Sequence, residues 1–158
     1  MKRLVLPLAI ALAAIVGPAV PADASGGRHC YVRVTGQEAD GQLVTSAPRC
    51  YASERQANDA ARASGGEQRS ASGSGILAVH RDGAGNSTSV AGSNCLGGWI
   101  NTSAYWFANM TYTTNVDCPV VRHYYSANLG GQTQDTYPGN GNLFAPLYHH
   151  VGSIQYLT

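Results

Sequence analysis

The chain has 158 residues, with ten Lys plus Arg, nine Asp plus Glu and a formal net charge of +1 at pH 7. This length supports one domain with a small additional segment. The charge is near zero and no basic stripe is present, so neither nucleic-acid binding nor a polybasic membrane contact is expected. From Ser74 onward the charged side chains, histidine aside, are Arg81, Asp82, Asp117, Arg122 and Asp135.

Residues 1–24 have the pattern of a secretory signal peptide. Lys2 and Arg3 precede an apolar run over 4–16, and Ala22-Asp23-Ala24 fits the cleavage rule for small residues. The run is shorter than the roughly 20 residues of a membrane-spanning helix. We therefore expect a secreted mature chain of 134 residues, Ser25–Thr158, with no membrane contact after cleavage.

Four cysteines, Cys30, Cys50, Cys95 and Cys118, lie in this mature chain. An even number outside the cytosol predicts two disulfides, for which three pairings exist. Proximity in sequence favours Cys30–Cys50 and Cys95–Cys118. No C-x-x-C pair occurs, so a four-thiolate metal site is disfavoured and no cofactor is expected.

Residues 25–66 predict a disulfide-stapled hairpin followed by a short helix. The strand signal covers 30–34, a turn signal covers 38–41, and 42–45 fits the returning strand. Ser53 and Gln56 form a capping box before an alanine-rich helix that Gly65-Gly66 would end. The unit has few large apolar residues, so we expect it to pack on the main domain. The Ser/Gly-rich residues 67–74 are read as a linker.

Residues 75–158 predict an all-β domain without helices. Short apolar or aromatic segments alternate with Gly, Asn and Pro, a pattern typical of sandwiches. The expected strand segments are 76–79, 98–100, 104–107, 120–121, 143–144 and 154–157.

A folded β-hairpin is predicted around residues 123–139. Tyr124 is followed by Gly131 and then by Thr133. In this arrangement the ring covers the turn, the glycine adopts a positive φ, and the hydroxyl ties the hairpin back.

A weaker copy of this pattern lies upstream, at His80, Gly85 and Ser87. The glycines and the hydroxyl residues of the two copies are 46 positions apart. We therefore expect two four-stranded halves, each burying the apolar face that the other cannot bury alone.

The segment 124–131, the following Pro138-Gly139 and the closing 151–155 resemble the βγ-crystallin Greek-key motif. The version found here is similar to bacterial exported proteins of the crystallin-like peptidase inhibitor family. The resemblance implies a two-motif Greek-key β-sandwich over residues 75–158 and a secreted, non-catalytic proteinase inhibitor. The first copy departs from the motif, because His80 stands at the aromatic position and its hairpin is shorter.

The resemblance implies calcium as the commonest ligand. The residues at the matching positions of this chain do not favour calcium binding. Residues 148–153 read Tyr-His-His-Val-Gly-Ser, and residues 108–113 keep only half of the oxygen ligands. His149 and His150 are adjacent, so on a strand they would face opposite sides and could not share a transition metal. His29, His80 and His123 are read as structural, with His123 pointing outward.

Catalysis is not expected. The sequence has no G-x-S-x-G or H-E-x-x-H motif and no obvious carboxylate pair. For an inhibitor of an extracellular protease, the candidate contact segment is Cys118-Pro119-Val120, within a loop expected over 109–120.

Alternative functions remain open at this point. They are an extracellular structural module, a cell-surface or carbohydrate-binding module, a calcium-binding module and a toxin-like protein. Four aromatic residues could either fill the core or form a carbohydrate platform. They are Trp99, Tyr105, Trp106 and Phe107. We expect the protein to be a monomer.

Overall fold

The computed structural model describes residues 28–64, 73–93 and 95–158. The predicted signal peptide, the Gly65-Gly66 stop and most of the predicted linker lie outside these ranges. The described elements, in chain order, are β1 (His29–Gln37), β2 (Leu43–Thr45), β3 (Arg49–Tyr51), α1 (Glu54–Ser64), β4 (Ile76–Asp82), β5 (Ser87–Ala91), β6 (Trp99–Asn101), α2 (Ala104–Asn109), β7 (Met110–Asn115), β8 (Val120–Ser126), β9 (Gly130–Thr136), β10 (Gly139–Asn142) and β11 (Ser153–Leu157).

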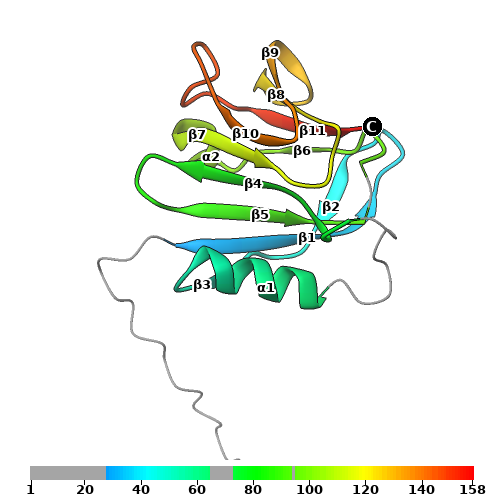
Figure 1. Cartoon of the computed structure of the whole chain (residues 1–158). Helices are drawn as coiled ribbons and strands as arrows, with labels where there is room; N and C mark the ends of the chain where they lie inside the picture. The colour runs from blue at the N-terminus through cyan, green and yellow to red at the C-terminus, as the bar shows by residue number, and fades with distance from the viewer. Residues whose placement is uncertain (1–27, 65–72, 94) are drawn as a thin grey trace, which may run out of the picture.

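Two β-sheets and one helix stack in three layers (Figure 1). The first sheet has the order β10-β7-β4-β5-β1-β2, with β3 also paired to β1, and the second has the order β6-β11-β8-β9. One apolar core lies between the sheets and a second lies between the first sheet and α1. Strand β4 is therefore covered on both faces, which explains the five consecutive buried residues from Ile76 to His80.

The two halves of the predicted all-β domain place their strands identically. In the first half β5, β4 and β7 are neighbours, and in the second half β9, β8 and β11 are neighbours. The third strand of each half, β6 or β10, crosses to the edge of the other half's sheet. This arrangement confirms a β-sandwich in which each half completes the other.

The N-terminal segment extends the first sheet. Strand β1 runs parallel to β5 and forms the predicted hairpin with β2, and the disulfide Cys30–Cys50 joins β1 to β3 just before α1. Ser53 caps α1 by accepting a hydrogen bond from the Gln56 backbone, as the sequence predicted. Arg81 of β4 holds the start of the helix through paired hydrogen bonds to Glu54 of 2.8 and 2.5 Å.

Residues 104–107 were predicted as a strand, and this prediction is wrong because they belong to α2. Ser103 supplies the missing signal: its hydroxyl accepts from the Trp106 backbone, and its carbonyl accepts from Phe107 at 2.8 Å. The loop expected over 109–120 is also partly wrong, because strand β7 occupies half of it, at Met110–Asn115. Strand β10 lies at Gly139–Asn142, ahead of the expected segment 143–144.

The tip of the β8–β9 hairpin rests directly on the start of β11. A Cβ atom on Gly152 would lie 2.2 Å from the carbonyl carbon of Ser126 and 2.5 Å from the Ala127 nitrogen. Next to it, the Ser153 hydroxyl donates to the Ser126 carbonyl at 2.8 Å and accepts from the Leu129 backbone at 2.9 Å. Only a residue without a side chain permits this approach.

We therefore expect Gly152→Ala to lower the free energy of unfolding by at least about 3 kcal/mol, because the contact is with backbone atoms that cannot rotate away. Urea denaturation of the purified protein measures the loss. Gly83→Ala is the matched control, since a Cβ there meets nothing within 4 Å. A Gly152→Ala protein as stable as the control would contradict the close packing of the hairpin tip.

Candidate functional site

The disulfide Cys95–Cys118 ties the loop before β6 to the loop before β8. Both cysteines are buried, yet Leu96, directly after Cys95, is 70% exposed. On its other side Gly97 is fixed to β11: its nitrogen donates to the Tyr156 carbonyl at 2.8 Å, and its carbonyl accepts from Gln155 Nε2 at 3.0 Å. A large apolar side chain is thus presented to solvent between two fixed residues.

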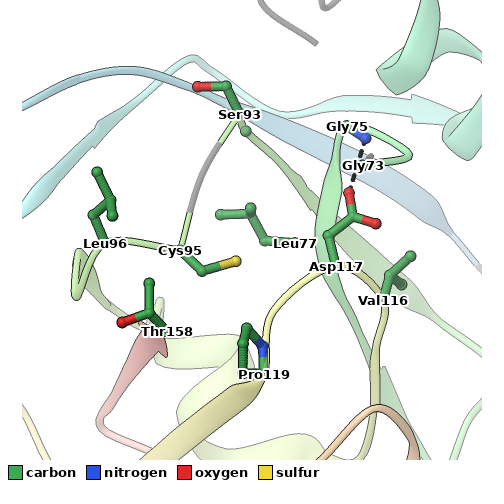
Figure 2. Close-up of a pocket in the computed structure, with 11 residues that line it drawn as sticks. Gly73, Gly75, Leu77, Ser93, Cys95, Leu96, Val116, Asp117, Pro119 and Thr158 are labelled. Atoms are coloured by element: carbon green, nitrogen blue, oxygen red, sulfur yellow. Dashed lines mark hydrogen bonds between the residues drawn. The ribbon is translucent and has the colours of Figure 1, made fainter. Parts of the chain in front are cut away.

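A hollow of about 330 Å³ lies beside this loop (Figure 2). The Asp117 carboxylate at its wall accepts from the backbone nitrogens of Ser74, Gly75 and Ile76 at 3.0, 2.9 and 3.2 Å. These bonds occupy the carboxylate in holding the start of β4. The lining comprises Gly73, Gly75, Leu77, Gly92, Ser93, Cys95, Leu96, Val116, Asp117, Pro119 and Thr158.

The predicted contact segment Cys118-Pro119-Val120 is placed beside the same hollow, with Pro119 at its wall. The Cys118 side chain is only 1% exposed, and Val120 begins β8, where it pairs with Leu157. Only Pro119 of the three is exposed. Two of its three residues are thus fixed by the cystine and by β8, and the exposed large apolar residue on the other side of the disulfide is Leu96.

In the structure, some of the residues that were predicted to shape the second hairpin have other roles. Gly131 has the expected positive φ of 79°, but the residue packed on it is Tyr125, whose Cβ lies 3.1 Å from the position of a Cβ on Gly131. Tyr124 instead donates its hydroxyl proton to Gln155 of β11 at 2.8 Å. Thr133 is exposed on β9, and the hydroxyl that ties the hairpin back is Ser153.

The first hairpin is closed by different chemistry. Gly85 has the expected positive φ of 87°, and Ser87 is buried and hydrogen-bonded to His29 Nδ1 at 2.9 Å. The loop itself is held by Asp82, whose carboxylate accepts from the backbone nitrogens of Ala84 and Asn86 at 2.9 and 2.8 Å. An Asx-type loop therefore closes the first hairpin, whereas the Ser153 hydroxyl ties back the second.

A chain of hydrogen bonds between buried polar side chains crosses the gap between the sheets. Thr113 of β7 contacts His80 Nδ1 at 2.9 Å and His123 Nε2 at 2.8 Å, and His80 Nε2 contacts the Tyr156 hydroxyl at 3.2 Å. His123 is 0% exposed, so the prediction that it points outward is wrong. His80 does not cover its hairpin and lies in the core instead. Because the four side chains are sealed from solvent, they act on stability rather than on a substrate.

Burial governs the titration of this cluster. It lowers the pKa of His123 to about 4 and lowers the pKa of His80 well below its ordinary value, since neither ring can be hydrated when charged. The charge of the neighbouring His123 lowers the pKa of His80 further. The same burial raises the pKa of Tyr156. The cluster is therefore neutral at physiological pH.

The aromatic residues divide between core and surface. Trp99 is 6% exposed and the partly buried Trp106 packs against the core between the sheets, so both contribute to the core. Phe107 of α2 and Tyr125 of β8 are exposed, and both contact the His150 ring. The sequence did not reveal this cluster because its members are far apart in the chain.

Within the described residues there is no group of three or more His, Cys, Asp or Glu side chains that could hold a metal ion. No helix in that part of the chain is long and apolar enough to cross a bilayer. Two disulfides are typical of a protein that folds in an oxidising, extracellular environment.

The chain matches no protein-family model, no curated protein and no solved structure.

Acid should destabilise the protein through the buried histidines. In the unfolded chain each ring binds a proton near pH 6.5. Burial lowers the pKa of His123 to about 4 in the folded chain and lowers the pKa of His80 as well, so their contribution to stability is complete above pH 6.5 and falls as the pH drops below it. Each ring contributes a slope of up to about 1.4 kcal/mol per pH unit. Urea denaturation between pH 7.5 and 4.5 measures this slope.

His123→Gln, which removes one titrating ring, should flatten the pH profile even if the variant is less stable at pH 7.5. A profile as steep as that of the wild type would rule out His123 as a source of the acid sensitivity.

Proposed function

We propose that this chain is a secreted, non-catalytic βγ-crystallin-like protein that inhibits an extracellular endoproteinase, with Leu96 as its primary contact. The observation that carries the proposal is the 70% exposure of a leucine between a buried cystine and a hydrogen-bonded glycine.

The strand arrangement supports the crystallin-like part of this proposal. In each half the fourth strand returns to lie beside the first, as it does in a Greek key, while the third strand joins the other sheet. The positive φ at Gly85 and Gly131 and the Ser153 tie to the second hairpin fit the same motif. The resemblance deduced from residues 124–131 and 151–155 is consistent with this arrangement.

The loop geometry supports the inhibitory part. A protease cleft binds an extended segment and draws one side chain into a pocket, and an inhibitor succeeds when its segment is already ordered. Leu96 suits an apolar pocket, and the residues on both sides of it are held by the cystine and by β11. If a protease cut next to Leu96, these contacts would keep both new ends in place and slow their release.

The neighbouring hollow supports a contact of this kind. It leaves space beside Leu96, so the rim of a cleft could approach the loop on this side without meeting another of the described residues. Asp117 in its wall accepts from four donors of Ser74, Gly75 and Ile76, so its carboxylate is engaged in holding the chain before β4.

Titration of the purified mature chain against a subtilisin-type serine proteinase and a thermolysin-type metalloproteinase tests the proposal. We expect saturable inhibition of one of them. Leu96→Ala should weaken inhibition at least about 30-fold, the effect of losing a contact worth about 2 kcal/mol at an interface centre. The readout is the inhibition constant with a peptide substrate.

Val44→Ala is the matched control, because Val44 is an exposed aliphatic residue (41%) on β2 in the N-terminal hairpin. It should inhibit like the wild type. No inhibition across a wider protease panel would reject the function. Inhibition that Leu96→Ala leaves unchanged would reject Leu96 as the contact and return attention to Pro119.

A further inference from the structure

We infer that a second surface of the protein, the aromatic cluster of Phe107, Tyr125 and His150, binds a neutral polysaccharide. This site is separate from Leu96 and adds a second binding activity to the proposed inhibition.

The three rings form one exposed group. The Tyr125 and His150 rings are stacked at 5.5 Å with an interplanar angle of 10°, and Phe107 meets His150 edge-on at 5.6 Å. Phe107 is 37% exposed and Tyr125 is 36% exposed. These side chains therefore keep ring surface for a ligand while supporting each other.

The backbone beneath the rings is fixed. The Phe107 carbonyl accepts from the Val151 nitrogen at 3.2 Å, and the Tyr124 carbonyl accepts from the Gly152 nitrogen at 2.8 Å. The segment 149–152 thus joins α2 to the β8–β9 hairpin and holds the rings at a constant separation. Such order limits the entropy lost when a ligand binds.

Backbone strain next to the cluster indicates that the position of His150 is imposed by its surroundings. His149 has φ 62°, a left-handed conformation that residues with a side chain seldom adopt. It is held there by hydrogen bonds from its nitrogen to the Met110 carbonyl at 3.0 Å and from its ring to the Ala108 carbonyl at 3.2 Å. Strain of this kind gathers at binding sites, and here it directs the next residue, His150, onto Tyr125.

An amide side chain, that of Asn128, lies at the tip of the hairpin that carries Tyr125. The Asn101 side chain accepts from the Asn128 nitrogen and donates to Asn128 Oδ1, each at 2.9 Å. Both residues are exposed, and within the described residues the Asn128 side-chain nitrogen donates to no partner. An amide fixed in this way can donate to a hydroxyl group of a ligand.

The absence of charge identifies the class of ligand. None of the five residues Asn101, Phe107, Tyr125, Asn128 and His150 carries a carboxylate, ammonium or guanidinium group. The nearby charged residues on the same hairpin, Arg122 and Asp135, form an ion pair with each other at 2.7 Å. A pyranose ring offers weakly positive C–H faces to aromatic rings and hydroxyl groups to amides, so an uncharged glycan complements this surface.

The test is retention of the mature protein on insoluble microcrystalline cellulose and on chitin, measured as depletion from solution. We expect retention on at least one polymer. The double variant Phe107→Ala/Tyr125→Ala should lose it by about tenfold or more, as removal of stacking contacts worth about 1.4 kcal/mol in total would cause. Tyr137→Ala is the control, because Tyr137 is an equally large exposed ring (64%) outside the cluster.

Asn128→Asp provides a second measurement if the ring variants fold poorly. Aspartate tolerates the φ of 55° at this position and keeps the size of the side chain while removing its donor. It should lower retention, and Leu96→Ala should not, which separates this site from the proposed inhibitory loop.

Failure of both polymers to retain the protein would overturn the inference. Equal losses in the cluster variants and in Tyr137→Ala would do the same. A dimer in sedimentation velocity that the double variant dissociates would show instead that a second copy of the chain covers the rings.

Discussion

The exchange of the third strand between the two halves is the constraint on which the rest of the structure depends. Strand β6 leaves the first half to pair with β11, and β10 leaves the second half to pair with β7. Neither sheet is complete without the other half of the chain, so the two sheets must form together. Residues of both proposed binding surfaces lie next to β6. The loop that contains Leu96 precedes this strand, and α2, which contains Phe107, follows it. Parts of both proposed binding surfaces therefore lie next to the strand by which the chain passes from one sheet to the other.

The core between the sheets joins apolar packing to a short polar network. Leu77, Val90, Val121 and Ile154 supply much of the apolar contact. The hydrogen bonds among His80, Thr113, His123 and Tyr156 cross the same gap, and a buried polar group must find such partners to be tolerated. Directional bonds of this kind fix the register of the two sheets more narrowly than apolar contacts alone, at the cost of sensitivity to acid.

Much of the fold could be predicted from local patterns. The capping box at Ser53 located α1, the turn at 38–41 located the first hairpin, and proximity in sequence gave both disulfide pairings. These signals work because each involves residues close together in the chain. Helix α2 was missed because its aromatic residues favour strands, and only the Ser103 cap reveals it.

The features that sequence could not give depend on contacts between distant residues. Ser153 closes a hairpin more than 20 positions upstream, and Gly152 is required only because Ser126 lies against it. His123 faces inward because Thr113 and the second sheet's register place it there. No pattern in the sequence distinguishes Leu96, because its importance depends on its exposure and on the fixed residues on both sides. The cluster at His150 likewise unites α2, β8 and the segment before β11.

The two cystines have a consequence for how the protein is made. Each joins neighbouring cysteines in the chain, with separations of 20 and 23 residues, and the two covalent loops do not overlap. A polypeptide that emerges N-terminus first can oxidise Cys30 with Cys50 before Cys95 appears, so no wrong partner is available at that moment. Correct thiol pairing then follows from the order of synthesis and requires little reshuffling afterwards.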